Sequence, residues 1–339
     1  MKVLFLILVF LSIGILFFVF GGKHILEKEI FVSSLSRSLD NSNIKDKDKE
    51  EDSEIILFAV GDIMLDRGIE YMVEKQGKGD WNFPFLNIVD YLKQADILFG
   101  NLESVISDKG QKVGSIYSFR ANPESLNGLI YAGFDVVSVA NNHIFDYGRI
   151  AMEDSLTRLE ESGIGYVGAG FSKQETHSVL TKEIKETKIG FLAYTNSGSK
   201  SWQAEEDSSG IAWLDETIAY DIKKAKQEVD ILVVSMHFGN EYQIEPSAEQ
   251  KYFAHLAIDS GADLVLGHHP HVIQAVEEYE NGFIAFSLGN FIFDQGFSEQ
   301  TLEGLLLKVL INDKKIKEVV SIKVEMNEFF QPSVSALNK

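Results

Sequence analysis

The chain has 339 residues, no cysteine and a formal net charge of −20. The absence of cysteine excludes disulfide bonds, thiolate metal sites and a cysteine nucleophile. The negative charge argues against a nucleic-acid partner, because a phosphate backbone requires a basic face, whereas the same charge attracts metal cations.

The chain begins with an uncharged apolar run from Val3 to Phe20. This is about the length needed to cross the core of a bilayer. No Ala-x-Ala-like cleavage site follows the run, which favours an uncleaved anchor over a signal peptide. We therefore predict a single-pass membrane anchor in residues 1–22. Residues 23–53 are rich in charge and poor in apolar side chains, which predicts a flexible tether.

From residue 54 onward, short apolar runs alternate with longer helical stretches. Continuous apolar runs are typical of strands covered on both faces, and their alternation with helices indicates βα units. The predicted strands of these units lie near residues 55–60, 96–100, 134–140, 230–236 and 262–267.

The last third of the chain has a different pattern. Asn281-Gly282 lies between two strand-like runs and is a hairpin signal, and a second pair of strands surrounds a turn near Asn312-Asp313. The predicted fold class is therefore mixed α/β, with βα units and antiparallel hairpins in one domain spanning residues 54–330. Residues 331–339 are predicted to form an unstructured tail.

Each predicted βα strand ends in a cluster of polar side chains. These are Asp62; Asn101 and Glu103; Asn141, Asn142, His143 and Asp146; His237 and Glu241; and His268, His269 and His271. Because the carboxyl ends of strands in open α/β sheets line the ligand crevice, we expect these side chains to converge. Carboxylates, amide oxygens and imidazoles suit Mn²⁺, Zn²⁺ or Fe²⁺, which predicts a site for one or two divalent metal ions.

The spacing of the three histidines after the last of these strands predicts which of them point toward the site. Along an extended backbone, His269 and His271 would point to the same side and His268 would face away. Single residues also have simpler explanations, since Asp62 could cap a helix, Asn142 could belong to a turn and His237 could be a core histidine. Capping alone does not explain ligand-type residues at five strand ends.

Six short motifs together resemble the CapA family of poly-γ-glutamate capsule biosynthesis proteins, which is related to calcineurin-like metallophosphoesterases. The motifs are FAVGDIML, GNLES, ANNHIFDYG, HFGNEY, GHHPHVIQ and SLGNFIFDQ, in the family's order. The resemblance implies a four-layer αββα sandwich of the metallophosphoesterase type, with the site at the strand ends. It also implies a domain outside the cytoplasmic membrane, held there by the N-terminal helix.

By this resemblance, the metal ligands would be Asp62, Glu103, Asn142, His237, His269 and His271. His143 would face the leaving group and donate a proton to it. Glu103 would supply the carboxylate that phosphoesterases usually place at the position of Asn101. Met64 stands where those enzymes usually have a histidine, and a thioether is a poor ligand for hard metals, so one metal position would be weakened or absent. Three further residues of the family pattern would line the pocket or pack its loops: Asn290, Asp294 and Gln295.

Three functions fit this sequence. The first is a metal-dependent hydrolase or transferase that acts on a phosphoester or an amide in capsule polymer production. The second is a non-catalytic component that binds an anionic polymer or braces other capsule subunits at the membrane, which the altered metal motif favours. The third is a cell-surface nucleotidase or phosphoesterase.

Overall fold

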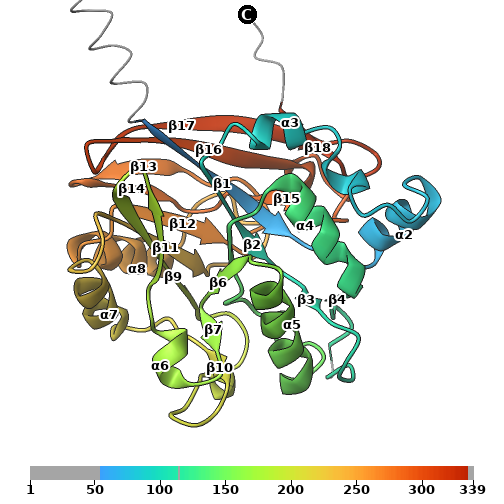
Figure 1. The fold of residues 1–339 in the computed structure, drawn as a ribbon, viewed down its shortest axis with the longest axis horizontal. Coiled ribbons are helices and arrows are strands. Elements are labelled where there is room, and N and C mark those ends of the chain that lie inside the picture. Colours follow the sequence, from blue (N-terminus) through green and yellow to red (C-terminus); the bar gives the residue numbers. More distant parts are fainter. Residues whose placement is uncertain (1–53, 114, 335–339) are drawn as a thin grey trace, which may run out of the picture. The chain divides into compact units, whose positions relative to one another are not determined.

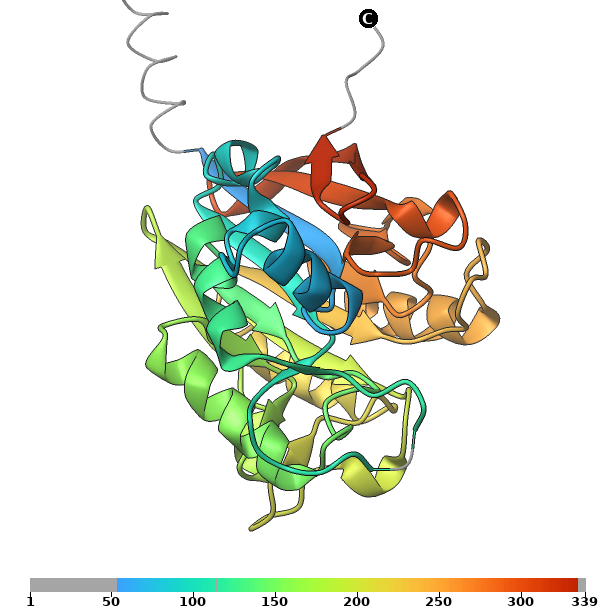
Figure 2. The same cartoon turned by 90° about the vertical axis from the view of Figure 1, so that its right-hand side faces the viewer.

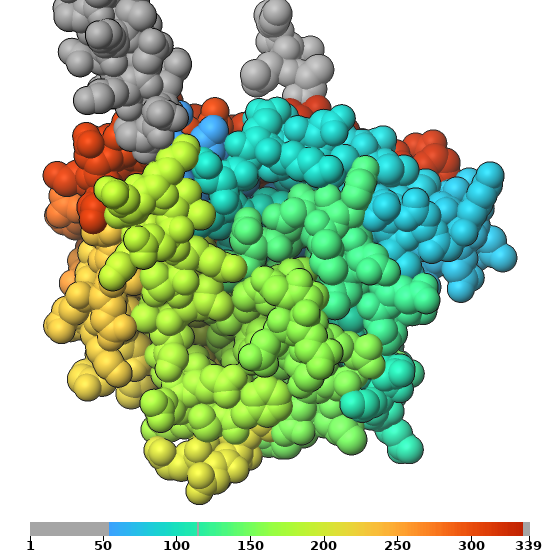
Figure 3. Space-filling model, in the orientation of Figure 1, coloured from blue at the N-terminus to red at the C-terminus, as the bar shows by residue number. Residues whose placement is uncertain are grey.

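Two β-sheets face each other in the part of the chain that the computed structural model describes, residues 54–113 and 115–334 (Figure 1). The predicted anchor and tether, residues 1–22 and 23–53, lie outside these described residues. Within the described ranges, no helix is long and apolar enough to span a membrane. The described residues from Ile55 onward belong to one compact unit, and Figure 3 shows its green and yellow-green segments packed directly against one another.

The larger sheet of the described residues has eight strands, in the order β18-β17-β16-β1-β2-β5-β6, with β15 paired to β1. β1, β2, β5 and β6 run parallel, whereas β16, β17 and β18 extend the sheet with antiparallel pairing. Their bounds are β1 (Ile55–Ile63), β2 (Ile97–Leu102), β5 (Val136–Ser138), β6 (Gly165–Val167), β15 (Asn290–Ile292), β16 (Glu303–Asn312), β17 (Lys315–Met326) and β18 (Pro332–Val334).

The smaller of the two facing sheets has six strands within the described ranges, in the order β13-β14-β12-β11-β9-β8. β9, β11, β12 and β14 run parallel, and β8 and β13 are antiparallel edge strands. Their bounds are β8 (Leu180–Ile184), β9 (Thr187–Thr195), β11 (Ile231–His237), β12 (Leu264–His268), β13 (Val276–Tyr279) and β14 (Gly282–Ala285).

The remaining elements connect and cover these sheets. Two short strand pairs are β3 (Val105–Ile106) with β4 (Arg120–Ala121), and β7 (Ala169–Gly170) with β10 (Gly210–Ile211). The α-helices are α2 (Gly68–Lys75), α3 (Val89–Leu92), α4 (Leu126–Ala132), α5 (Arg149–Glu161), α6 (Lys173–Thr176), α7 (Ile218–Ala225) and α8 (Ala248–Asp259). The 3₁₀ turns are η1 (Phe83–Phe85), η2 (Pro123–Ser125), η3 (Lys200–Trp202) and η4 (Gln300–Leu302).

Apolar side chains fill the space between the sheets and the space under the helices. Phe99 of β2 and Phe191 of β9 stack between the sheets, with ring centroids 5.6 Å apart. Helices α2, α3, α4 and α5 pack on the outer face of the larger sheet, and α7 and α8 pack on the outer face of the smaller one (Figure 1). The mixed α/β fold with two sheets agrees with the sequence prediction.

Local sequence signals explain the helices that flank the smaller sheet. α7 buries Ile218, Ile222 and Ala225, whose spacing places them on one helical face. α8 begins with a capping box, in which Ser247 and Gln250 each accept a hydrogen bond from the other residue's backbone N–H. The capping box fixes where α8 starts, and β12, which follows it, pairs with β11 and β14.

The two predicted hairpins are present with small shifts of the turn. β13 and β14 pair antiparallel around Glu280 and Asn281, one residue earlier than the predicted turn. β16 and β17 pair around Asp313 and Lys314. In both cases the turn lies one residue away from the predicted pair because the flanking residues complete the ladder.

The predicted unstructured tail is wrong for residues 331–334. Gln331 is buried, and its side-chain amide donates a hydrogen bond to the carbonyl of Phe83 at 2.6 Å. Pro332–Val334 form β18, which pairs with the end of β17. The strand was missed because it is only three residues long and its partner lies on the other side of a turn.

Candidate metal centre

The predicted site residues lie where the carboxyl ends of strands from both sheets meet. Asp62 on β1 is paired with Asn101 on β2, and His237 on β11 is paired with His268 on β12. The register between β1 and β2 shifts just before Asp62, which is the signature of a bulge that re-aims a side chain. A Cβ atom on Gly61 would lie 2.0 Å from the carbonyl oxygen of Gly289, so only glycine permits this close approach.

Two overlapping groups of side chains are close enough to share a metal ion. One group is Asp62, Glu103 and His237, and the other is Glu103, His269 and His271. In each group the candidate ligand atoms lie within 4.8 Å of one another, and all five residues are buried. Glu103 belongs to both groups, so it stands at the centre of the cluster.

Three asparagines form hydrogen bonds within and around this cluster. The Nδ2 atom of Asn101 lies 2.9 Å from Asp62 Oδ1, 3.3 Å from Glu103 Oε2 and 3.3 Å from His237 Nδ1. His237 Nε2 lies 2.7 Å from Asn142 Oδ1, so these two predicted ligands contact each other. Asn141 in turn donates hydrogen bonds to Asn101 Oδ1 and to the carbonyl of Leu102. The side-chain amides of asparagines at the same strand ends therefore hold the predicted ligands close together.

The expected geometry of the three clustered histidines is wrong in two respects. His269 and His271 converge, with ring centroids 6.0 Å apart, but both have positive φ, 97° and 58°, and not an extended backbone. His268 does not face away from the site, because its Nδ1 lies 3.2 Å from Asp62 Oδ1. The reason is that β12 continues through His268 with its side chain between the sheets, and the chain turns sharply only after it.

His143 and His271 are each oriented by a fixed partner. His143 Nδ1 lies 2.7 Å from Asp146 Oδ2, and its ring packs 4.0 Å from the ring of Phe119. His271 Nδ1 lies 3.0 Å from Asn290 Oδ1. Asp146 and Asn290 each accept a hydrogen bond from Nδ1, so Nε2 is the atom that each ring presents toward Glu103, at 3.7 and 3.6 Å.

The remaining predicted pocket residues lie farther from the cluster. Gln295 accepts a hydrogen bond from Asn290 Nδ2 and donates one to the Tyr242 hydroxyl. Asp294 pairs with the guanidinium of Arg67, a residue that the sequence analysis did not select. Glu241 is exposed at the rim of the pocket.

Burial and mutual contact set the protonation of the cluster. Burial alone would raise the pKa of Asp62, but contacts with His268 and His271 hold it well below its ordinary value. Burial, with the charges of Asp62 and Glu241, raises the pKa of Glu103 well above its ordinary value. Burial also lowers the pKa of His269 to about 3 and that of His237 well below its usual range. These imidazoles are therefore neutral at pH 7, which is the form that binds a metal.

The residues present fit a divalent metal ion. Glu103 Oε1 and His269 Nδ1 are buried and have no hydrogen-bond partner within the described residues. Buried polar atoms without a partner are costly, and a cation between Glu103 and the histidines would satisfy the carboxylate oxygen. The donor set of carboxylate, imidazole and amide oxygen matches Mn²⁺, Zn²⁺ or Fe²⁺. Met64 is buried near the cluster, with its sulfur 3.1 Å from the backbone nitrogen of Asp66.

A pocket of about 460 Å³ opens beside the cluster. Asn142, His143 and His271 form its polar floor. Sequence reasoning missed the other residues of its wall, which come from four loops and follow no periodic pattern: Arg67, Ser115, Tyr117, Phe119, Tyr242 and Phe297. The loop that carries Tyr117 and Phe119 joins β3 to β4, and Figure 2 shows it in teal, crossing the front of the domain below α2.

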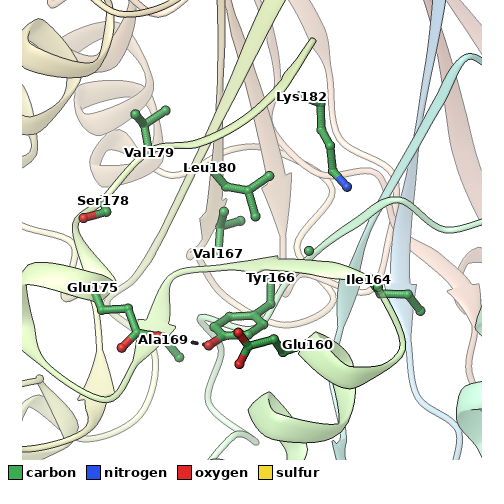
Figure 4. Close-up of a pocket in the computed structure, with 12 residues that line it drawn as sticks. Glu160, Ile164, Tyr166, Val167, Ala169, Glu175, Ser178, Val179, Leu180 and Lys182 are labelled. Atoms are coloured by element: carbon green, nitrogen blue, oxygen red, sulfur yellow. Dashed lines mark hydrogen bonds between the residues drawn. The ribbon is translucent and has the colours of Figure 1, made fainter. Parts of the chain in front are cut away.

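A second pocket, of about 380 Å³, lies between the edge strands β6 and β8 (Figure 4). Tyr166 donates a hydrogen bond to Glu175 there, with Glu160 close by and the apolar side chains of Val179 and Leu180 on the other side. No histidine lines this pocket within the described residues. The candidate chemistry therefore belongs to the first pocket.

The chain is similar to capsule proteins over most of its length. A family model described as bacterial capsule synthesis protein PGA_cap matches residues 56–295. The capsule biosynthesis protein CapA of Bacillus anthracis is 31% identical over 300 residues, covering 85% of this chain and 72% of that protein. The PGA biosynthesis protein CapA of Bacillus subtilis is 34% identical over 243 residues, covering 70% of this chain and 63% of that protein.

Two solved structures are similar at low identity. One is a phosphatase from Mycoplasma pneumoniae, with a TM-score of 0.46 and 15% identity, covering 82% of this chain and 96% of that one. The other is the NAD nucleotidase of Haemophilus influenzae, with a TM-score of 0.42 and 11% identity, covering 84% of this chain and 54% of that one. The match of the family model over residues 56–295 confirms the resemblance found in the sequence, and the chain belongs to the bacterial capsule synthesis protein family PGA_cap.

Proposed function

We propose that this chain acts in the synthesis or export of a poly-γ-glutamate type capsule polymer, with a metal-dependent hydrolase site in its buried cluster. The observation that carries the proposal is the meeting of Asp62, Glu103, His237, His269 and His271 at strand ends of two sheets. The names of the capsule relatives supply the polymer, and the cluster supplies the chemistry. We further propose that residues 1–22 anchor the chain in the cell membrane, with the domain outside the cytoplasm.

The proposed ligands of the metal are Asp62, Glu103, Asn142, His237, His269 and His271. A divalent ion held there would polarise an oxygen atom of a phosphoester or an amide. Asn101 and Asn290 act on this set by hydrogen bonding, because they fix the carboxylate of Asp62 and the ring of His271. Such supporting contacts orient metal ligands and raise their basicity.

His143 is the proposed proton donor to the leaving group. Its Nδ1 is held by Asp146, and its Nε2 lies at the edge of the pocket, 3.7 Å from Glu103 Oε1. Phe119 packs against the ring and limits its rotation. A proton on Nε2 of His143 would face the pocket, which suits the role of proton donor.

The experiment is metal analysis of the purified protein, together with assays in Mn²⁺ on aryl phosphates and on γ-linked glutamate oligomers. We expect bound metal and hydrolysis in the wild type, and loss of both in Asp62→Ala and His269→Ala. His255→Ala is the matched control, because His255 pairs with Glu277 on the far side of the smaller sheet. A metal-free wild-type protein that is inactive on every substrate would refute the hydrolase assignment.

A non-catalytic role is the second candidate, and the buried thioether of Met64 in the opening motif favours it. In that case the chain would bind the polymer or brace other capsule subunits. Polymer export that survives His269→Ala but is abolished by deletion of residues 1–22 would support this role over hydrolysis. Hydrolysis of nucleoside monophosphates alone would instead indicate a cell-surface nucleotidase.

A further inference from the structure

Arg67 is held in a fixed position in the wall of the first pocket. Its guanidinium lies 4.7 Å from the centre of the Phe119 ring, and Phe119 in turn contacts His143. Its Nε donates to Asp294 Oδ2 at 3.1 Å, and its Nη2 donates to the other oxygen of that carboxylate. The guanidinium of Arg67, the ring of Phe119 and the imidazole of His143 therefore lie next to one another in this order along the pocket wall.

The backbone of Arg67 has an uncommon conformation. Its φ is 52° and its ψ is −113°, and a positive φ is uncommon for any residue other than glycine. Such conformations cost about 1–3 kcal/mol and persist where the surroundings enforce them, often at functional sites. The contacts with Asp294 and Phe119 keep the side chain at the pocket in spite of this cost.

Arg67 still has donors to offer a ligand. A guanidinium carries five N–H groups, and Asp294 occupies only the Nε group and one on Nη2. Nη1 makes no hydrogen bond to any described residue, and the side chain is 34% exposed. Among the described residues that line the pocket, Arg67 is the one with a permanent positive charge.

The surrounding charges favour a ligand with a single negative charge. Asp294 already offsets part of the charge of Arg67, and Glu241 at the rim repels anions. A dianionic phosphate would meet more repulsion here than a carboxylate, whose two oxygens also match the planar guanidinium. Exposed aromatic side chains at the rim, Tyr117 and Phe297, can cover the methylene groups of a flexible acidic chain.

We propose that Arg67 determines specificity by binding a carboxylate of the substrate other than the group at the metal cluster. The substrate class is then an oligomer of acidic units that each bear one free carboxylate. This inference rests on the proposed function and specifies the ligand of the same site. The reacting bond lies over Asn142, His143 and His271, and the neighbouring carboxylate reaches Arg67.

The test is calorimetric binding of γ-linked glutamate oligomers to the full-length protein in Mn²⁺, compared with the same oligomers carrying carboxamides in place of the free carboxylates. We expect the wild type to prefer the carboxylate form by about tenfold or more, and Arg67→Gln to lose this preference. Arg67→Lys keeps the positive charge but lacks the planar guanidinium, so it should keep part of the preference for the carboxylate form. Arg149→Gln is the control, since Arg149 lies over Phe145 outside the pocket.

Cooperative unfolding and unchanged metal content of Arg67→Gln would show that the variant is folded. Equal affinity of the wild type for both oligomers would overturn the inference. So would an equal loss of affinity for an aryl phosphate in Arg67→Gln, because Arg67 would then bind the reacting group itself. Since the readout is binding, a catalytically inactive wild type would refute the proposed hydrolase activity while leaving this inference to be decided by the oligomer preference.

Discussion

The Glu103→Gln substitution separates the electrostatic cost of the buried cluster from its metal affinity. Burial, with the charges of Asp62, Glu241 and Asp146, raises the pKa of Glu103 well above its ordinary value. In the unfolded chain, glutamate loses its proton at about pH 4.3. Between that pH and the raised pKa, the folded metal-free protein binds more protons than the unfolded one. The free energy of unfolding therefore falls as pH rises, by at most about 1.4 kcal/mol per pH unit for one proton.

In the presence of a chelator, we expect this slope to appear as a pH-dependent difference in the free energy of unfolding between wild type and Glu103→Gln. The difference starts at about pH 4.3, grows as pH rises and becomes constant above the raised pKa of the folded state, with Glu103→Gln the more stable protein. A divalent metal ion should reverse the ranking, because binding to the folded state stabilises it and a neutral amide is a weaker ligand than a carboxylate.

Urea unfolding, followed by the fluorescence of the three tryptophans, measures this difference with chelator and with Mn²⁺ at pH values from 5 to 8. Glu160→Gln serves as the control, because Glu160 is exposed and lies at the other pocket. If the free energy of unfolding depended on pH in the same way in wild type and Glu103→Gln with chelator, Glu103 would not have a raised pKa in the folded protein. Equal stabilisation of both proteins by Mn²⁺ would refute Glu103 as a ligand.

Three further predictions concern the core, a helix cap and the site. Phe99→Ala removes a ring stacked between the sheets and should lower the free energy of unfolding, measured in urea, by about 3–5 kcal/mol. The control is Tyr220→Ala, whose side chain is 72% exposed and whose removal should change this free energy by less than about 0.5 kcal/mol. Ser247→Ala removes the α8 cap and should cost about 1 kcal/mol, and no measurable loss would contradict the capping box. Asp146→Asn should lower kcat with unchanged metal content, because His143 loses its orienting partner; a parallel loss of metal would place Asp146 in metal binding instead.

The sequence by itself predicted the elements whose signals are local. Apolar runs predicted the central strands, and the Asn-Gly pair predicted the β13–β14 hairpin. The residue types at the strand ends predicted that these side chains converge, with His268 as the exception, because parallel strands that share a sheet end at the same edge. The motif order predicted the family over residues 56–295.

Only the tertiary structure decided which surfaces meet. Arg67 and Asp294 are 227 residues apart, and no local pattern relates them. The inward position of His268 depends on where β12 ends, and the pairing of β18 depends on a partner across a turn. Local patterns are set by the short-range geometry of the chain, whereas these contacts depend on how two sheets pack, so the pocket wall and the fixed guanidinium could be found only in the folded protein.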